Sequence, residues 1–404
     1  MEDLTAAETA ARLGVKVATI YAYVSRGALT SHRSPDGRTS LFRRDDVEAL
    51  ARRGRPRRST RPPSLDLVIE TRLTSIDDHR VLYRGHDAAA LARSATFEQV
   101  AELLWTGTWP VERPSWTAGP APGLDASGLD VPGLVDRLRV AVVLAGAADP
   151  LRGDLRPEAC VATARSLLAT LVESLPVLGN GRVSRLTLPA GGAPLPATLA
   201  GRLWSRLASG RPPPGMLGVL NAALVLMADH ELASSTFAAR IAASTRADPY
   251  AVVGAGLGPL AGPLHGGAGR ATRRVIERAA GPNGAGPALA EAMADHGMFP
   301  GFGHHLYPDG DPRARVLLDL LRSTAGDTRA MRVVDAVLAT ARSRAPIQPN
   351  VDFALAALGF VVSMPPAGEE VVITVARTAG WLAHAMEEYG EAPLRFRPRA
   401  VYTP

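Results

Sequence analysis

The sequence predicts a mainly α-helical protein whose first sixth forms a separate basic unit. Between Leu65 and Ala261 most of the chain is rich in Ala, Leu and Val at helical spacing, with Gly and Pro clusters near Gly179–Pro196 and Gly210–Gly215. No internal repeat and no alternation of strand and helix patterns occurs. Up to Ser64, thirteen Arg and Lys oppose seven Asp and Glu, whereas the remainder holds thirty-two of each sign. This asymmetry indicates a polyanion-binding head on a neutral body.

Length and composition limit the class of protein further. With 404 residues the chain is long enough for two or three domains, and its 46% hydrophobic content supports a large core. No apolar stretch is long enough to cross a bilayer, and the N-terminus lacks the profile of a signal peptide. Cys160 is the only cysteine, which excludes an internal disulfide and metal clusters built on several thiolates. We therefore expect a soluble cytoplasmic protein.

The first fifty residues contain the signals of a compact helical unit with a hairpin. Thr5 and Glu8 form a capping box that starts a helix over Ala6–Leu13. After Gly14, the pattern predicts a second helix over about Val15–Arg26, on which Val17, Ile20 and Val24 share the inner face. The remaining expected elements are a hairpin formed by Leu29–Arg33 and Thr39–Arg43 around an Asp-Gly turn, and a closing helix over Asp45–Arg52.

This order of elements resembles the small winged helix-turn-helix of the MerR and excisionase families. In such domains the second helix enters the major groove of DNA and the hairpin wing touches the backbone. The resemblance assigns possible DNA contacts to Lys16, Thr19, Tyr23 and Arg26 on the second helix, and to Arg33 and Arg38 on the wing. A protein-binding adaptor, or a relic that binds nothing, is the alternative. The head would span residues 1–54, an Arg/Pro-rich linker residues 55–64, and the body residues 65–404.

The start of the body departs from the helical pattern before returning to it. Ile69–Ile76 is β-rich, Phe97–Thr106 is predicted as an amphipathic helix, and Trp109–Pro132 is rich in Pro and Gly and is expected to be a loop.

Histidines flanked by glycines mark the candidate site. His265 lies within Gly262–Gly269, and His304 follows Gly301-Phe302-Gly303. Glycines allow close approach of the backbone, and a neutral imidazole can donate a hydrogen bond or transfer a proton. Taken alone, each would be a loop histidine. The additional carboxylate of Asp352, just before an apolar run, favours a catalytic set.

Several further motifs, in order and spacing, resemble citrate synthase over essentially all of residues 65–404. They are Tyr83–Asp87, Phe97–Trp105, Ala228–Leu232 with Ser235–Phe237, Gly262–Gly267, Gly301–His304, Asp311–Ala314, Asn350–Phe353, Ala376–Trp381 and Arg397–Arg399. The resemblance implies the citrate synthase fold, a large helical domain plus a smaller helical domain at about residues 262–366, and a homodimer.

The resemblance also implies a role for each candidate residue. Asp352 would remove a proton from the acyl group of the thioester, and His265 would donate a hydrogen bond to the enolate oxygen. His304 would polarise the ketone of oxaloacetate. The expected ligands of the dicarboxylate are His230, Arg313, Arg377 and, from a second subunit, Arg397. Acetyl-CoA or propionyl-CoA would be the co-substrate, and neither a metal nor a permanently bound cofactor is expected.

Four departures from the family pattern lie near the expected site. Gly269-Arg270 replaces an Asn-Glu pair, Ala233 replaces an Asn, and His305 stands where Arg is frequent. Tyr307–Gly310 lacks a basic residue suited to a CoA phosphate, which predicts weaker CoA binding unless other arginines substitute. Two functions are therefore considered: condensation of acetyl-CoA with oxaloacetate to citrate (or of propionyl-CoA to 2-methylcitrate), and a metabolite-sensing DNA-binding regulator whose body has little or no turnover.

Overall fold

The computed structural model divides the chain into two compact units, Met1–Glu70 and Thr71–Pro404. It describes residues 3–13, 15, 17–25, 29–34, 39–52, 68–77, 79–119, 130–178, 185–186, 195–398 and 402. In this part of the chain, no helix is long and apolar enough to span a membrane. The Arg/Pro-rich linker predicted at residues 55–64 lies outside the described residues.

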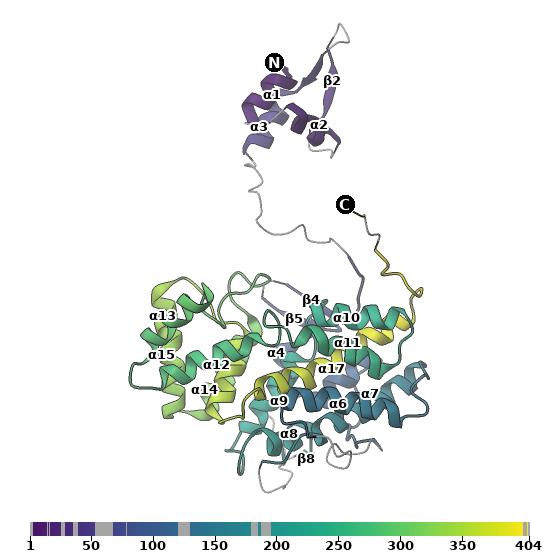
Figure 1. Ribbon diagram of the computed structural model, residues 1–404, viewed down its shortest axis with the longest axis vertical. Helices are drawn as coiled ribbons and strands as arrows, with labels where there is room; N and C mark the ends of the chain where they lie inside the picture. Colours follow the sequence, from purple (N-terminus) through teal and green to yellow (C-terminus); the bar gives the residue numbers. More distant parts are fainter. Residues whose placement is uncertain are drawn as a thin grey trace. The chain divides into compact units, whose positions relative to one another are not determined.

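The N-terminal unit is built from helices and one small antiparallel sheet (Figure 1). The predicted capping box is confirmed, because the Glu8 carboxylate accepts from the Thr5 N–H at 2.8 Å and the Thr5 hydroxyl accepts from the Glu8 N–H at 3.3 Å. The two predicted hairpin strands pair as expected, and a short first strand extends the sheet. The elements are β1 (Leu4–Thr5), α1 (Ala6–Leu13), α2 (Val17–Ser25), β2 (Ser31–Arg33), β3 (Ser40–Phe42) and α3 (Arg44–Arg52), with strand order β1-β3-β2.

The inner face of α2 differs in part from the predicted one. Ile20 is fully buried, and Tyr23 and Val24 pack against the same small core. Val17, predicted to face inward, is 43% exposed; helical spacing puts it on the same side as Val24, but it is the first residue of α2 and is not among the residues that pack on the small core. Tyr23 therefore contributes to packing in the head.

The body is mainly α-helical, as predicted, with one three-stranded sheet at its start. The predicted helix Phe97–Thr106 is confirmed with the same bounds, and the described parts of Trp109–Pro132 contain no helix. The first elements are β4 (Thr74–Ile76), β5 (Val81–Tyr83), β6 (His86–Asp87), α4 (Ala88–Ser94), α5 (Phe97–Thr106), α6 (Leu134–Ala148), α7 (Pro157–Glu173), β7 (Arg185–Leu186), β8 (Leu195–Ala197) and α8 (Leu199–Leu207). The later elements are α9 (Met216–Met227), α10 (Ser234–Ser244), α11 (Pro249–Leu260), α12 (Ala268–Ala279), α13 (Ala285–His296), α14 (Pro312–Ala325), α15 (Arg329–Arg344), α16 (Val351–Val361) and α17 (Gly368–Tyr389).

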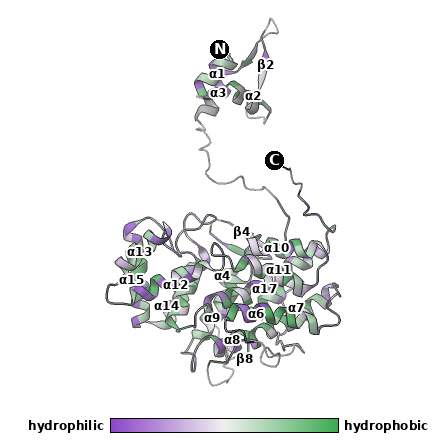
Figure 2. Ribbon diagram, in the orientation of Figure 1, coloured by the Kyte–Doolittle hydropathy of each residue, from purple (hydrophilic) through white to green (hydrophobic). Residues whose placement is uncertain are grey.

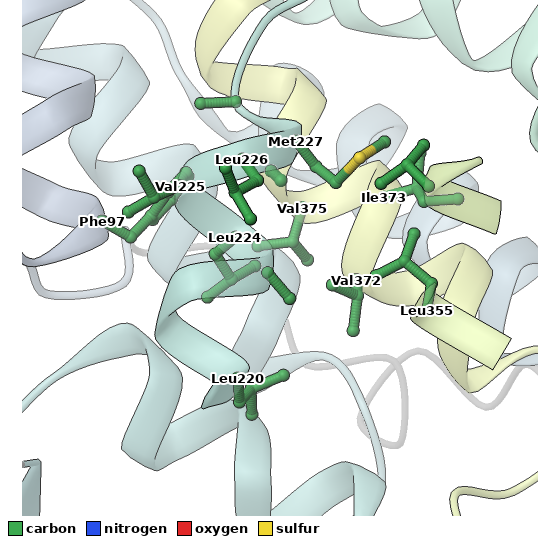
Figure 3. Packing of buried hydrophobic residues seen from close by; sticks show 14 of the residues in the cluster. Phe97, Leu220, Leu224, Val225, Leu226, Met227, Leu355, Val372, Ile373 and Val375 are labelled. Atoms are coloured by element: carbon green, nitrogen blue, oxygen red, sulfur yellow. The ribbon is translucent and has the colours of Figure 1, made fainter. Parts of the chain in front are cut away.

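Two apolar helices, α9 and α17, form the centre of the body. Every residue of α9 is buried, which is typical of a helix that is hydrophobic on all sides. Figure 3 shows Leu224 of α9 beside Val375 of α17, and Leu355 of α16 close to Val372. In Figure 2 the same helices carry mostly hydrophobic colour, whereas hydrophilic colour recurs on α13 and α15. The candidate site draws on the turn after α9, on the middle of α17 and on the first turn of α16.

Helices α12, α13, α15 and α16 pack on one another at one side of the body, away from α6, α7 and α11 (Figure 1). Helix α14 contacts both α16 of this group and the central helix α9. The candidate site takes residues from α14, α16 and α17, from the turn after α9, and from the loops before α12 and α14. The smaller domain at about residues 262–366 remains a prediction.

Candidate active site

His230 lies in a tight turn that follows the buried helix α9. It is 8% exposed, and its Nε2 atom is 2.7 Å from the hydroxyl of Tyr307. The ring of His304 meets it edge to face at 5.7 Å. Burial, together with the charges of Arg313 and Arg377, holds the pKa of His230 well below its ordinary value. The imidazole is therefore neutral near pH 7.

The loop that carries His304 is fastened to the segment before α16. The N–H of Gly303 donates to the carbonyl of Gln348 at 2.8 Å, and the N–H of Asn350 donates to the carbonyl of Gly301 at 2.9 Å. Gly301 has a φ of +83°, and a Cβ there would come within 2.6 Å of Thr272. Both the backbone conformation and the lack of space therefore require glycine at this position. This pairing brings the His304 loop to the start of the helix that carries Asp352.

The hydrogen bonds of His304 determine which ring nitrogen carries the proton. The backbone N–H of Leu306 donates to Nδ1 at 3.2 Å, so Nδ1 accepts and Nε2 carries the hydrogen. Burial and the charge of Arg313 lower the pKa of His304 to about 4. His304 is therefore a neutral donor, and His305, although exposed, stacks on it at 5.1 Å.

His265 lies in the turn just before α12. Its Nε2 atom is 2.8 Å from the hydroxyl of Ser235, which leaves Nδ1 open to a ligand. Burial, with the charge of Arg377, lowers the pKa of His265 to about 4. The glycines that follow are required by the chain itself, since a Cβ on Gly266 would come within 2.5 Å of the carbonyl of Leu260. The close approach predicted for these glycines is therefore a contact between the backbone at Gly266 and the backbone at Leu260.

Asp352 occupies the first turn of α16, at the start of the apolar run noted in the sequence. The side chain of Asn350 caps the helix by accepting from the N–H of Asp352 at 3.0 Å. The carboxylate of Asp352 receives no hydrogen bond in the described part of the chain and keeps part of its surface open. Burial raises the pKa of Asp352 to about 6, although the charge of Arg313 opposes the shift. A carboxylate with such a pKa is suited to act as a general base near neutral pH.

Arg313 is held rigidly by the residue that caps its own helix. The carboxylate of Asp311 accepts from Nε and Nη2 of Arg313 at 3.0 and 2.9 Å, and also from the N–H of Val351 at 3.0 Å. Both side chains are buried, and the guanidinium carbon lies 5.7 Å from the centre of the Tyr307 ring. Burial lowers the pKa of Arg313, but the charge of Asp311 outweighs it and leaves the pKa above its ordinary value.

Arg377, in the middle of α17, is buried without a carboxylate in contact. It is 3% exposed, and its Nε atom donates to the carbonyl of Met227 at 3.0 Å. Among the described residues, its two terminal nitrogens have no hydrogen-bond partner. Burial lowers the pKa of Arg377, and the charge of Asp229 opposes this shift. Its free nitrogens are available to an anionic ligand.

The structure brings most of the predicted site residues together and leaves others apart. The rings of His230 and His304 are in contact, Tyr307 links both to Arg313, and Arg377 donates to the carbonyl of Met227 at the end of the helix before His230. His265 and Asp352 border these four residues: His265 is hydrogen-bonded to Ser235, and Val351, the residue before Asp352, donates to the carboxylate of Asp311 that pairs with Arg313. Arg397 is exposed on the C-terminal segment and makes no contact with this set. In the head, Thr19 is half-buried and Arg33 is exposed, whereas Lys16, Arg26 and Arg38 lie outside the described side chains.

Three contributors to the site had no predicted role. Tyr307 bonds His230, Ser235 bonds His265, and Asp311 bonds Arg313. Each lies within a few residues of a predicted site residue, so their positions in the motifs were visible in the sequence. In two cases, Tyr307 with His230 and Ser235 with His265, the partner lies in a distant segment of the chain. The local sequence pattern cannot show such a pairing.

Comparisons with known proteins agree with this geometry. Residues 66–399 match the profile of the family "Citrate synthase, C-terminal domain", and residues 4–55 match that of "Helix-turn-helix domain". Citrate synthase 2 of Bacillus subtilis is 30% identical over 350 residues, which cover 82% of this chain and 92% of that protein. A 2-methylcitrate synthase of Mycobacterium tuberculosis is 28% identical over 336 residues, covering 79% and 84%.

Solved structures show the same fold. The citrate synthase of Thermotoga maritima superposes with a TM-score of 0.64 at 23% identity, covering 84% of this chain and 94% of that one. The enzyme of Thermoplasma acidophilum, in a ternary complex with carboxymethyl coenzyme A and oxaloacetate, superposes with a TM-score of 0.60 at 21% identity, with the same coverage. The chain therefore belongs to the citrate synthase family and is a citrate synthase-type enzyme with a helix-turn-helix domain at its N-terminus.

Proposed function

We propose that this enzyme condenses acetyl-CoA with oxaloacetate to give citrate and CoA, and that propionyl-CoA is a second possible donor. One observation carries the proposal: a carboxylate with a pKa of about 6 and a neutral histidine, His304, feel the charge of Arg313, and a second neutral histidine, His265, feels that of Arg377, a buried arginine with no counter-ion in contact. Proton abstraction beside a thioester needs the base, the charge that develops on oxygen needs the donors, and a dicarboxylate needs the cation.

The proton transfers use the tautomer of His304 described above and, for His265, the tautomer with the hydrogen on Nδ1, in which the Ser235 hydroxyl donates to Nε2. Asp352 takes a proton from the carbon next to the thioester, while Nδ1–H of His265 donates to the enolate oxygen that forms. That carbon then forms a bond to the ketone carbon of oxaloacetate, and the ketone oxygen takes the proton from Nε2 of His304. Water finally cleaves the thioester: its oxygen joins the acyl carbon to give the carboxylate, and the sulfur leaves as the CoA thiol. The proton taken up by Asp352 is released to solvent and Nε2 of His304 regains one from solvent, so both groups return to their starting states. Both histidines must be neutral for these steps, and their pKa of about 4 ensures this at pH 7.

The arginines and His230 account for binding of oxaloacetate. Arg377 offers unpaired terminal nitrogens, and Arg313 retains Nη1 after Asp311 has taken Nε and Nη2. Carboxylates bind an arginine fork through short, charge-assisted bonds. His230 is held in place by Tyr307 and adds one polar contact at the same end of the site.

Binding of CoA phosphates is assigned to arginines outside the usual position. A cavity of about 370 Å³ is lined by Arg315, Arg322 and Arg342, and also by Asp309, Asp311 and Asp319. Arg322 is engaged with Asp335 at 2.7 Å, whereas Arg315 and Arg342 have no ion pair in the described part of the chain. These two residues could replace the positive charge that the segment Tyr307–Gly310 lacks.

A homodimer is proposed from the outer faces of α6, α10 and α11. Helix α11 packs against both α6 and α10, and Gly254 and Gly258 lie on its exposed face. Val143 of α6 is 69% exposed and Ile241 of α10 is 39% exposed. A second copy would cover these apolar side chains. Arg397 makes no contact with the site of its own chain, and in a dimer it would instead reach the site of the other copy.

For the N-terminal unit we propose DNA binding, with Thr19 on α2 and Arg33 on β2 among the contacts; Tyr23 packs on the core of the head and would contribute only through the part of its side chain that stays exposed. Lys16, Arg26 and Arg38 remain part of the prediction. DNA affinity should fall steeply as salt is raised; a weak salt dependence would instead favour protein assembly. A His265→Ala variant should lose turnover and keep DNA binding. The cytoplasmic location also remains a prediction.

Release of free CoA thiol from purified protein tests the reaction. Oxaloacetate is supplied with acetyl-CoA or with propionyl-CoA, and release should occur with one donor and disappear in Asp352→Asn. No release with either donor, while oxaloacetate still raises the melting temperature, would contradict the proposal and favour the sensor function.

A further inference from the structure

A buried polar network lies directly behind the His230 turn. It runs from Asp229, the residue before His230, to His384 on α17, and from His384 to Arg240 on α10. Asp229 and His384 are fully buried and Arg240 is 1% exposed. Beyond Arg240 the network reaches Glu388, whose carboxylate accepts from Nε of Arg240 at 3.0 Å. None of these groups takes part in the reaction proposed above, yet all are removed from water at a cost that their hydrogen bonds must offset.

The hydrogen bonds fix the tautomer of His384. Nη1 of Arg240 lies 3.0 Å from Nδ1 of His384, and a guanidinium can only donate. Nδ1 therefore accepts, and the hydrogen on Nε2 points to Oδ2 of Asp229, 3.3 Å away. The hydroxyl of Thr74 donates to the same oxygen. The other oxygen, Oδ1, has no partner in the described part of the chain, so two donors alone orient this carboxylate.

The backbone around His230 needs such support. Glu231, the next residue, has a φ of +48°, a conformation that costs energy for any residue except glycine. Tyr83 is within hydrogen-bond distance of the carbonyls of Leu226 and Asp229, at 3.2 and 3.1 Å. Asp229 is therefore held through both its carbonyl and its side chain, and the strained turn persists because these contacts determine it.

We infer that Thr74 and His384 are positioning residues for oxaloacetate: through Asp229 they hold His230 in its turn and keep a negative charge near Arg377. Neither side chain touches the substrate. The negative charge matters because Arg377 has no carboxylate in contact, and Asp229 favours its charged form. His265 and Asp352, which act on the acyl group, are not bonded to this network. The inference depends on the proposed function only for the identity of the dicarboxylate.

Two pairs of variants test the inference. Thr74→Val removes one donor to Asp229 with almost no change in volume, and Thr74→Ser restores it. His384→Leu removes the other donor, and His384→Gln supplies an amide that can donate to Asp229 and accept from Arg240. For the first member of each pair we expect the KM for oxaloacetate to rise about tenfold and the KM for acyl-CoA to stay within about twofold. The second member should return both values to near wild type.

A matched control separates positioning from general loss of stability. Leu382→Ala removes buried volume from the same helix, so it should lower the melting temperature without changing the ratio of the two KM values. An unchanged KM for oxaloacetate in Thr74→Val, or an equal rise in Leu382→Ala, would overturn the inference. If His384→Leu does not fold, the Thr74 pair decides. If the wild type releases no CoA thiol, the proposed function fails, and calorimetric binding of oxaloacetate to the same variants still tests the positioning role.

Discussion

The body contains two kinds of buried charge a short distance apart. Arg313 forms a two-pronged pair with Asp311 at the start of α14, whereas Arg377 and Asp352 have no oppositely charged side chain in contact within the described residues. A buried pair is neutral and rigid, and removing one partner is costly. A buried single charge destabilises the fold but remains available to a ligand. Paired charges such as Arg313 and Asp311 therefore hold the site in shape, whereas the unpaired charges of Arg377 and Asp352 are available to bind or react with a ligand.

The largest expected effect comes from removing the single negative charge. Asp352→Asn should lower kcat about 10³-fold, because no other described carboxylate occupies the first turn of α16 to replace the base. The same variant should be more stable at pH 7 by about 1–2 kcal/mol, a value discounted for partial exposure. Folding raises the pKa of Asp352 from 3.8 to about 6, so the protonated form stabilises the fold at low pH, and this stabilisation is lost as the pH rises from about 4 through 6.

Both parts of this prediction can be measured. Turnover is followed by thiol release, and stability by denaturant unfolding at pH 4 and pH 7. In the wild type, kcat should rise with pH through about 6 and then level as Asp352 ionises. An Asn variant that is less stable than wild type at pH 7 would show that Asp352 is not a destabilising single charge.

Removing the positive single charge, Arg377, should also impair the enzyme, with a smaller loss of activity than Asp352→Asn. Arg377→Leu should raise the KM for oxaloacetate about 10- to 100-fold, because charge-assisted bonds to a carboxylate are lost. Its free energy of unfolding should change little, since an apolar side chain replaces a cation that no carboxylate contacts, although Asp229 loses a nearby positive charge. Parallel kinetics and urea unfolding provide the measurement, and Arg377→Lys is the control that keeps the charge but loses the planar fork.

The paired arginine should show the opposite pattern in stability. Arg313→Leu leaves the Asp311 carboxylate buried without its partner, and we expect a loss of about 3–5 kcal/mol in the free energy of unfolding. Asp311→Asn combined with Arg313→Leu should recover part of that loss, because the remaining buried charge is removed. Equal stability losses for Arg313→Leu and Arg377→Leu would abolish the distinction between paired and single charges.

The sequence predicted the local part of this arrangement. The sequence singled out Asp352 just before an apolar run, and the structure places Asp352 in the first turn of the helix that this run forms, with Asn350 as its cap. The Asp-Pro-Arg motif identified Arg313 as a site residue. It did not reveal that the carboxylate of Asp311 would also accept a hydrogen bond from the N–H of Val351, forty residues away. The pattern of a single sequence shows which residues share one face of a helix or strand. The pairing of charges between distant segments depends on tertiary contacts, so the sequence could not show that Arg377 would be buried without a carboxylate in contact.

The smallest effect is expected for charges at the protein surface, which water screens. Arg315→Ala or Arg342→Ala should raise the KM for acyl-CoA a few-fold and leave the KM for oxaloacetate unchanged, because each side chain is exposed at the cavity that Asp309 also lines. The effect should shrink as salt is raised, unlike the effect of Arg377→Leu, because the buried cation is poorly screened. Arg329→Ala, an exposed arginine on α15 that does not line the cavity, is the matched control. A KM for acyl-CoA that is insensitive to both substitutions and to salt would place the CoA phosphates elsewhere, and would leave the contrast between single and paired charges to rest on the buried residues alone.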